Sequence, residues 1–588
     1  MVELKTIETV DTSPFKHLIM SIGELPSSFV DSMTYYECLA WLVNYIQNTV
    51  IPAVNNNAEA TQELQDAFVT LKNYVDHYFD NLDVQEEVNT KLDAMVEDGT
   101  LAEIINQEIF SELNNEIGTA NDNITAINTK IGTMTDLNTV NKDTLVKSIN
   151  SANENYITTF RRKYGNNYQL FTTGISYFDN NVRVYKDIFS NSFDYYINLN
   201  NYKNTGGTTY YVNPDTAEAV GSQTGALDHP YGTIKQAWLI ADDGDTIALF
   251  GGIYTRSKVN ITPDEYYHKS INIIAYNGTP YITNADDLTY TQNATYSNVY
   301  QTTRSGTVMG IDMRGKDKDV FARLTKVASL AECSETLDSY YTSGSTVYVN
   351  IGEVPNKNKV IFPLSISAPM MPIKSTTANL RIYLEGLCCL GGDLGIITIE
   401  SSDSYTCEVI ATECRFYFAT NNTNAMTVKG ANTIFHKCKA CFACRDGFNY
   451  HLAHSKNCNS IELDCVGAYN GLLTDTSNNN NGSTTHDGNK ALRINCTYFN
   501  NGGPNVCDVN LDTHTFNINC ASFDSKGTGQ TVKSDFYASD GGSTMDLYNC
   551  YSRGSNSYVN LITGSGNIMN VHNCIYDTTI NNGTMNIE

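Results

Sequence analysis

Short alternations of apolar and polar residues recur through the C-terminal half of the chain, and each lies beside a cysteine. The cysteines recur every 24 to 31 residues, at Cys389, Cys414, Cys438, Cys465, Cys496, Cys520, Cys550 and Cys574. From Cys465 onward each follows Asp or Asn, as in Leu492-Arg-Ile494-Asn-Cys496. A repeat of this length, made of strands and turns, predicts one coil of a solenoid. We therefore expect stacked β coils over residues 370–588.

Like residues one coil apart should lie over one another. The cysteines would then line the core as small apolar side chains, and asparagines at the neighbouring bend would share amide hydrogen bonds. In the last two coils, however, the apolar residues Met545, Leu547, Met569 and Val571 are out of phase with Cys550 and Cys574. A corner or bulge must intervene there, or these two cysteines face elsewhere.

The N-terminal part has helical rather than strand spacing. Thr34-Tyr-Tyr-Glu37 has the form of a capping box. Two stripes with alternating spacings of three and four residues follow, at Leu64, Phe68, Leu71, Val75, Tyr78 and Leu82, and at Leu113, Ile117, Ala120, Ile124, Ile127, Ile131 and Met134. This spacing is that of the a and d positions of a coiled-coil heptad, which form the seam between helices. Isoleucine at both of these positions favours trimers or tetramers. We expect residues 28–160 to form an α-helical region with a trimeric coiled-coil stalk, although 64–82 fits helices packed within one chain equally well.

The charge balance is strongly acidic. The 588 residues include 38 Lys and Arg against 64 Asp and Glu, for a net charge of −26. Such a surface repels nucleic acids and anionic membranes, so we expect no nucleic-acid partner. Charged residues make up only 17% of the chain, and the polar surface is carried by Asn, Thr, Ser and 38 Tyr. These groups suit sugars, but they are also good strand and turn formers, so composition alone does not decide.

The sixteen cysteines are spread along a long chain, which is typical of reduced thiols rather than of a small secreted disulfide scaffold. The opening Met1-Val-Glu-Leu-Lys lacks the basic and apolar regions of a signal peptide. No uninterrupted apolar run reaches the length of a membrane span. We expect folding in a reducing cytoplasm, without membrane insertion.

A motif begins the β body. Tyr210-Tyr-Val-Asn-Pro is followed by Asp228-His-Pro-Tyr-Gly-Thr-Ile-Lys-Gln-Ala-Trp238 and by Ala241-Asp-Asp-Gly-Asp-Thr-Ile-Ala-Leu-Phe-Gly-Gly-Ile-Tyr254. This order reads as a strand, a short amphipathic helix and a buried strand, and the helix would cover the open apolar end of the first coil. The stretch resembles the opening of right-handed parallel β-helix proteins of the pectate-lyase type, which include many phage tailspikes. The resemblance covers 206–280 by motif and 370–588 by coil period.

The resulting fold class is mainly β, a right-handed parallel β-helix body behind a helical stalk. Its expected parts are an N-terminal segment 1–27, the stalk 28–160, a neck 161–205, the cap and first coils 206–284, a β insertion 285–369 and the coils 370–588.

The resemblance implies a homotrimeric bacteriophage tailspike or another tail or neck appendage. Such a protein is made in the host cytoplasm, joins the virion and docks to other virion proteins through its N-terminal region. Its β-helix would attach to a bacterial surface polysaccharide as a receptor-binding protein. Two alternatives stay open: a polysaccharide depolymerase, either a glycoside hydrolase or a lyase, on the same face, or a purely structural neck or tail fibre.

One conspicuous aspartate lies between successive ladder cysteines. Coils about 4.8 Å apart would place carboxylates on one face roughly 5 or 10 Å apart, spacings that suit retaining or inverting glycosidases. Crowded carboxylates also split their pKa values into one acid and one base. We therefore expect catalytic candidates at Asp487, Asp446, Asp508 and His486, and glycan-binding candidates at His451, Tyr450, Asn505, His514 and Asp535. The alternative is that these aspartates only form turns.

A metal site is the remaining candidate chemistry. Cys438-x-x-Cys441-x-x-Cys444, with Cys458 and His451 nearby, has spacings found in zinc and iron–sulfur sites. The coil period already explains Cys438, and three cysteines at this spacing do not converge within one straight strand. No calcium-binding repeat, phosphate loop or dinucleotide motif occurs. We expect no metal and no cofactor.

The stalk generates a prediction about assembly. Removing residues 1–160 should yield weakened trimers or monomers, because the seam would then no longer hold three subunits together. The molar mass of both proteins in solution, measured by light scattering over a range of dilution, checks this. A shortened protein that stays trimeric on dilution would contradict it.

Overall fold

The computed structural model describes residues 168–260, 265, 267–307, 309–365, 370–393, 395–420, 423–471, 480–526, 533–553 and 559–588. The expected N-terminal segment 1–27 and stalk 28–160 lie outside these residues. Among the described residues, no helix is both long and apolar enough to cross a membrane.

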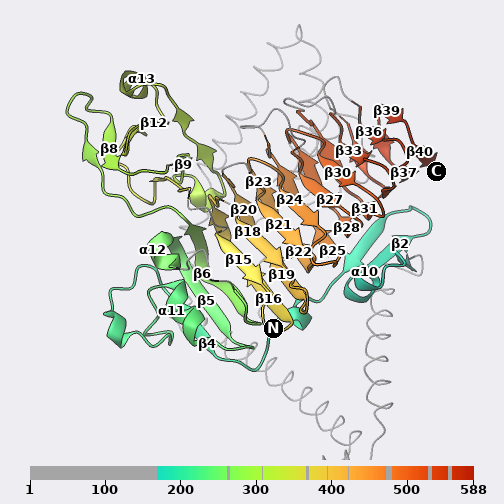
Figure 1. Cartoon of the computed structure of the whole chain (residues 1–588), viewed down its shortest axis with the longest axis horizontal. Coiled ribbons are helices and arrows are strands. Elements are labelled where there is room, and N and C mark those ends of the chain that lie inside the picture. The colour runs from blue at the N-terminus through green and yellow to red at the C-terminus, as the bar shows by residue number, and fades with distance from the viewer. Residues whose placement is uncertain are drawn as a thin grey trace, which may run out of the picture. The chain divides into compact units, whose positions relative to one another are not determined.

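The body is a right-handed parallel β-helix of about 11 coils, seen as the stacked arrows of Figure 1. Each complete coil contributes one strand to each of three parallel sheets. The nine-stranded sheet consists of β15 (Met371–Lys374), β18 (Ile397–Glu400), β21 (Met426–Lys429), β24 (Phe448–His451), β27 (Ser483–His486), β30 (Val506–Val509), β33 (Phe536–Ser539), β36 (Leu561–Thr563) and β39 (Thr579–Asn581).

The second sheet begins with the first coils of the body. It consists of β4 (Thr209–Val212), β5 (Thr246–Tyr254), β6 (Asn272–Thr283), β16 (Leu380–Glu385), β19 (Cys407–Thr412), β22 (Asn432–His436), β25 (Asn459–Leu463), β28 (Lys490–Ile494), β31 (His514–Ile518), β34 (Thr544–Tyr548), β37 (Ile568–His572) and β40 (Thr584–Ile587). The third sheet continues from the ends of β5 and β6 through β17 (Cys388–Leu390), β20 (Arg415–Tyr417), β23 (Lys439–Cys441), β26 (Val466–Ala468), β29 (Thr497–Phe499), β32 (Ala521–Phe523), β35 (Tyr551–Ser552) and β38 (Ile575–Tyr576).

A single residue in the left-handed conformation turns the chain from the second sheet into the third. Its φ lies between 51° and 55° at Asp464, Asn495, Asn519, Asn549 and Asn573. Asn and Asp tolerate this conformation better than other non-glycine residues do. The amide of Asn519 donates to Asn495 at 3.1 Å, and that of Asn573 donates to Asn549 at 2.8 Å. The predicted stacking of asparagines at this bend is confirmed.

From Cys414 onward the residue after each bend is a ladder cysteine, and its side chain points into the tube. The thiol of Cys465 donates to the backbone carbonyl of Phe435 at 3.3 Å, and that of Cys496 donates to the backbone carbonyl of Glu462 at 3.3 Å. Cys438, Cys465, Cys496 and Cys520 are at most 1% exposed, and the side chains of successive cysteines contact one another. The predicted row of thiols is confirmed from Cys414 onward, whereas Cys389 is opposite Phe416 and Leu387 takes the place of a cysteine in that coil.

The bend also explains the phase change in the last two coils. The left-handed residue shifts the inward alternation by one position, so Arg493 and Cys496 both point inward while Leu492 and Ile494 point outward. In the last coils Leu547 points inward, together with Cys550. Apolar residues an even number of positions before the cysteine, such as Leu492 and Ile494, therefore lie outside the tube. This is the reverse of what the sequence pattern predicted, because such residues were expected to line the core with the cysteine.

These outward apolar residues are covered by residues 168–202, which we call the covering segment. It contains β1 (Tyr168–Phe171), α10 (Ser176–Asn181), β2 (Arg183–Asp187), β3 (Phe193–Tyr196) and the 3-10 turn η4 (Leu199–Tyr202). Figure 1 shows β2 and α10 beside the coils. Phe178, Val184 and Phe193 of the segment form one buried cluster with Ile410, Ile434, Ile461, Leu463, Leu492, Ile494, Phe516 and Ile518. The Tyr195 hydroxyl also donates to Asp464 at 2.6 Å, which ties the segment to the bend.

The helix α11 (Ile234–Ile240) lies where a cap is expected. Thr233 and Gln236 form a capping box at its start. Ile234, Ala237 and Trp238 are buried in the same core as the first coils. Two short helical turns, η5 (Val220–Ser222) and α12 (Arg256–Val259), flank the same region.

An insertion separates β6 from β15. It contains β7 (Thr291–Gln292), β8 (Tyr300–Thr303), β9 (Ile311–Asp312), η6 (Lys316–Lys318), β10 (Ala322–Arg323), β11 (Thr325–Lys326), α13 (Leu330–Glu335), β12 (Ser339–Ser343), β13 (Thr346–Asn350) and β14 (Val360–Ile361). β12 and β13 form the expected hairpin, with Gly344 in the left-handed conformation at its turn. Ile311 and Met313 pack against Cys388 and Tyr417, so the insertion covers the first strands of the third sheet.

The covering segment gives a prediction about stability. Phe178 is completely buried in the cluster between the segment and the second sheet. Phe178→Ala should lower the free energy of unfolding by about 3–5 kcal/mol, because it leaves a cavity in that cluster. Urea unfolding of the variant and the wild type measures the difference. Phe189→Ala, at a side chain 76% exposed, is the matched control, and equal effects of the two changes would contradict the packing.

Candidate functional site

Two histidines lie side by side on the outer face of the nine-stranded sheet. Side chains alternate between the two faces of a strand, so His451 and His486, at the ends of β24 and β27, both point outward. The pairing of Tyr450 with Thr485 brings the next residues of both strands together. The two imidazole rings stack, with centroids 4.4 Å apart and planes 10° apart.

A carboxylate faces this pair. Asp487 follows β27 in the left-handed conformation, with φ 57°. Its Oδ2 lies 3.9 Å from His451 Nδ1, and the Asn510 amide donates to its Oδ1 at 2.5 Å. The side chains of His451 and Asp487 are each 37% exposed. This part of the sheet therefore offers polar groups to a ligand in solution.

A second carboxyl supports the histidines from behind. Asp446 accepts hydrogen bonds from the backbone of Asn481 at 2.7 Å and from the Asn449 amide at 2.5 Å. That same amide lies 3.4 Å from His486 Nε2. Burial raises the pKa of Asp446 to about 6. We call Asp446, Asn449, His451, His486 and Asp487 the histidine cluster.

Burial keeps both imidazoles neutral near pH 7. It lowers the pKa of His486 to about 4 and also lowers the pKa of His451. The Lys429 ammonium, beside His451 in the sheet register, lowers the pKa of His451 further. Each neutral ring offers one hydrogen-bond donor and one acceptor, and an unprotonated ring nitrogen can also accept a proton. The cluster therefore combines neutral polar groups with one half-exposed carboxylate.

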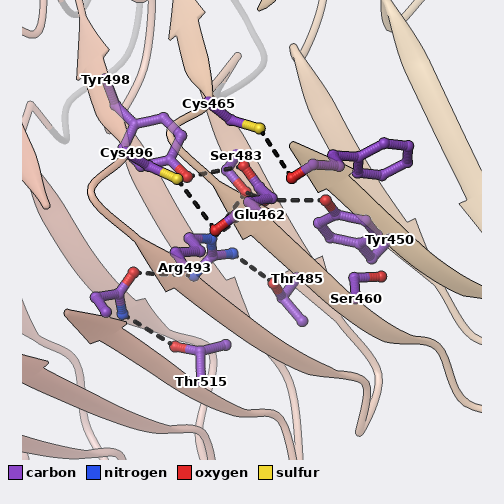
Figure 2. A network of polar contacts seen from close by, with 12 residues as sticks. Tyr450, Ser460, Glu462, Cys465, Ser483, Thr485, Arg493, Cys496, Tyr498 and Thr515 are labelled. Carbon is purple, nitrogen blue, oxygen red and sulfur yellow. Dashed lines mark hydrogen bonds and ion pairs between the residues drawn. The ribbon is translucent and has the colours of Figure 1, made fainter. Parts of the chain in front are cut away.

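Several of the candidate residues lie inside the tube instead. Figure 2 shows the interior network in which the Tyr450 and Tyr498 hydroxyls donate to Glu462 at 2.9 and 2.8 Å. Arg493 lies between Glu462 and Asp508, 3.5 Å from each. All five residues are completely buried. Burial raises the pKa of Glu462 to about 6 and also raises the pKa of Asp508, while Arg493 opposes both shifts.

Asn505 and Asp535 are also completely buried, and the Asn505 amide donates to Asp535 at 3.1 Å. His514 lies on β31 of the second sheet, where its Nε2 is 2.7 Å from Asp546. The structure thus brings together Asp446, His451, His486 and Asp487, and it places Tyr450, Asn505, Asp508, Asp535 and His514 elsewhere. We leave the latter five out of the candidate site, because four lie inside the tube and the fifth lies on another sheet.

The sequence reasoning missed Asn449, Asn510 and Lys429. A signal was available for two of them, because Asn449 lies three residues after Asp446 and Asn510 lies one coil after Asp487. Their roles depend on strand register, which no single coil reveals.

The cysteine-rich stretch 438–444 does not converge. Cys438 belongs to the core of the tube, whereas Cys441 packs outside it with the insertion. Within the described ranges, no group of three or more His, Cys, Asp or Glu side chains is placed to hold a metal ion.

Comparison with known proteins finds no matching family model and no matching curated protein sequence. Among solved structures, XylC in complex with xylose is 10% identical with a TM-score of 0.38, over 65% of this chain and 70% of that chain. The pectate lyase Pel9A is 12% identical with a TM-score of 0.26, over 64% and 80%. The tailspike protein gp49 from Pseudomonas phage LKA1 is 10% identical with a TM-score of 0.20, over 64% and 77%.

The interior network gives a prediction about pH. Arg493→Met leaves Glu462 and Asp508 buried without their cation, which should lower the free energy of unfolding at pH 7 by about 3–5 kcal/mol. The pKa values of both carboxyls should rise further in the folded variant. A carboxyl whose pKa is raised by folding destabilises the fold as pH rises through that range, so the deficit of the variant should shrink from pH 7 toward pH 5.

Denaturant unfolding of both proteins at the two pH values measures this deficit. Lys490→Met removes a cation from the same strand at a position half-open to solvent. It should cost less than about 1 kcal/mol at either pH. A deficit of Arg493→Met that is equal at pH 7 and pH 5 would contradict the assigned charges.

Proposed function

We propose that this chain is a bacteriophage virion appendage that attaches to a bacterial surface polysaccharide through the histidine cluster. The observation that carries the proposal is the stacked pair of neutral imidazoles beside the half-exposed carboxylate of Asp487. Binding sites for sugars need donors and acceptors that match hydroxyl groups and need few fixed charges. This surface has that composition, although the chain as a whole is strongly acidic.

Each member of the cluster has a distinct part in this proposal. Asp487 accepts hydrogen bonds from sugar hydroxyls through its half-exposed carboxylate. His451 supplies a donor or an acceptor according to its tautomer, and Asp446 with Asn449 fixes the orientation of His486. Rigid β strands hold the backbone of these residues, so little conformational freedom is lost on binding.

The virion setting and the homotrimer rest on the sequence. The isoleucine-rich heptad pattern at 113–134 favours trimers or tetramers, of which we propose the trimer, and reduced cysteines agree with folding in the host cytoplasm before release. Attachment to other virion proteins through the N-terminal region belongs to the same proposal.

Cleavage of the bound polysaccharide is the second candidate, and one observation favours it. Asp446, whose pKa is about 6, and the neutral histidines can hold or accept a proton near neutral pH. In a lyase reaction, His451 would take the proton from the carbon next to a uronate carboxyl. A C=C bond would form to the neighbouring carbon, and the glycosidic C–O bond would break with its electron pair going to the leaving oxygen, which takes a proton from water. In a hydrolase, Asp446 and Asp487 would serve as the paired carboxyls.

Binding of the full-length protein to host-wall polysaccharide, followed by sizing of the polysaccharide, tests both candidates. His451→Ala and Asp487→Asn should weaken binding at least tenfold, because each removes a group that faces the ligand. His514→Ala, a histidine on the second sheet, should change it less than twofold. Shortened polysaccharide would assign cleavage, and Asp446→Asn should then abolish the shortening.

If His514→Ala loses binding while His451→Ala binds as well as the wild type, the placement of the site is contradicted. A wild-type protein that neither binds host cells nor competes with phage for adsorption would contradict glycan attachment and would favour a purely structural fibre.

A further inference from the structure

The row of ladder cysteines changes its exposure at one end. Cys520 is 1% exposed and Cys550 is 2% exposed, so neither thiol meets solvent. Cys574, in the next coil, packs against the same core but is only half-buried. Every other cysteine that the structure describes is buried. A dissolved molecule can therefore reach the row at Cys574.

The strand register places Cys550 directly opposite Cys574. β34 pairs with β37 before the bend, and β35 pairs with β38 after it, with the same offset of 24 residues. Paired strands lie about 4.8 Å apart. A disulfide needs two Cα atoms about 4.4–6.8 Å apart. The backbone therefore holds these two cysteines within disulfide range.

The two sulfur atoms face the same space inside the tube. Cys574 Sγ accepts a hydrogen bond from the backbone N–H of Cys550 at 3.2 Å. The Cys550 thiol donates to the backbone carbonyl of Asn517 at 3.2 Å, and the Cys574 thiol donates to that of His572 at 3.4 Å. A thiol is a weak donor, so little is lost when a disulfide replaces these two hydrogen bonds.

The two thiols also differ in reactivity. A hydrogen bond with the Cys550 side chain lowers the pKa of Cys574, whereas burial raises the pKa of Cys550. The thiolate is the nucleophile in thiol–disulfide exchange. Cys574 is thus both the accessible and the more easily ionised member of the pair.

We propose that Cys550 and Cys574 are a redox site, which a small-molecule disulfide such as oxidised glutathione converts into a disulfide that holds their two coils together. The Cys574 thiolate attacks one sulfur of the small disulfide, whose S–S bond breaks, and one small thiolate leaves and takes up a proton. The Cys550 thiol then gives its proton to water, and its sulfur attacks Cys574 Sγ. The second small thiolate leaves and takes up a proton. The two cysteines thereby lose two electrons and two protons, which the small disulfide gains.

The bond would lie in coils that have open apolar side chains. Ile568 of β37 and Ile575 of β38 are 40% and 49% exposed. Segments with few buried contacts open locally more easily than the core does. A covalent bond between residues 24 positions apart restricts such opening. Exposure to an oxidising exterior after release rests on the proposed function, whereas the chemistry of the pair does not.

The test begins with the full-length protein purified under reducing conditions. It is equilibrated with reduced and oxidised glutathione in varied ratio, its free thiols are blocked, and its disulfides are mapped by mass spectrometry after digestion. The 550–574 disulfide should form as the oxidised fraction rises, while Cys496 and Cys520 stay free. Free Cys550 and Cys574 at every ratio, or a disulfide between Cys550 and Cys520, would overturn the inference.

Three variants test the order of the two steps. Cys550→Ala should leave Cys574 as a mixed disulfide with glutathione, because the attacking thiol is kept and its partner is lost. Cys574→Ser should leave Cys550 free, and oxidation of Cys550 in this variant would contradict the assigned roles. Cys496→Ala, which removes a buried thiol two coils away, is the matched control and should still form the 550–574 bond. If a variant fails to fold, the disulfide map of the wild type decides.

Hydrogen exchange of the wild type tests what the bond does. The amides of β37 and β38 should exchange at least fivefold more slowly in the oxidised protein than in the reduced one, and those of β19 and β22 should not change. Equal exchange at β37 and β38 in a protein that carries the bond would overturn its role in holding the coils. Neither measurement uses a polysaccharide. A protein that forms the bond but binds no glycan contradicts the proposed function alone, and the reverse result contradicts this inference alone.

Discussion

The left-handed bend between the second and third sheets is the constraint on which the rest of the structure depends. At this bend one left-handed residue per coil, an asparagine or aspartate from Asp464 onward, reverses the alternation of side chains, and the next cysteine enters the tube. Hydrogen bonds between bends, such as Asn573 to Asn549, hold neighbouring coils in register. Every coil bends at an equivalent position. Whether a polar side chain lies inside the tube or on its surface therefore depends on how many residues separate it from the bend.

Much of the fold could be predicted from the sequence, because the cysteine period, the asparagine bend and the capping helix are local patterns repeated in space. The direction of side chains around the bend could not. Leu492 and Ile494 alternate in phase with Cys496, yet they face the covering segment, which lies about 300 residues earlier in the chain. Similarly, Asp508 and Asp487 look alike as turn-side aspartates, but strand register buries one beside Arg493 and leaves the other half-exposed.

The separation of inside from outside also organises the chemistry. Glu462, Arg493 and Asp508 form ion pairs with one another within the tube, so these charged groups serve the fold and do not face a ligand. The outward positions of β24 and β27 carry the histidine cluster instead.

The central claim is that residues one coil apart lie directly over one another, with His451 and His486 paired on the outside. Replacing both histidines by cysteine and oxidising the folded protein tests this claim most directly, because a disulfide needs the two Cα atoms within roughly 7 Å. The account predicts a 451–486 disulfide, detected by mass spectrometry of the digested protein. It predicts no disulfide in the control variant, which carries cysteine at positions 450 and 486 and keeps His451. Two free, reactive thiols at 451 and 486 after oxidation, or a 450–486 disulfide in their place, would contradict it.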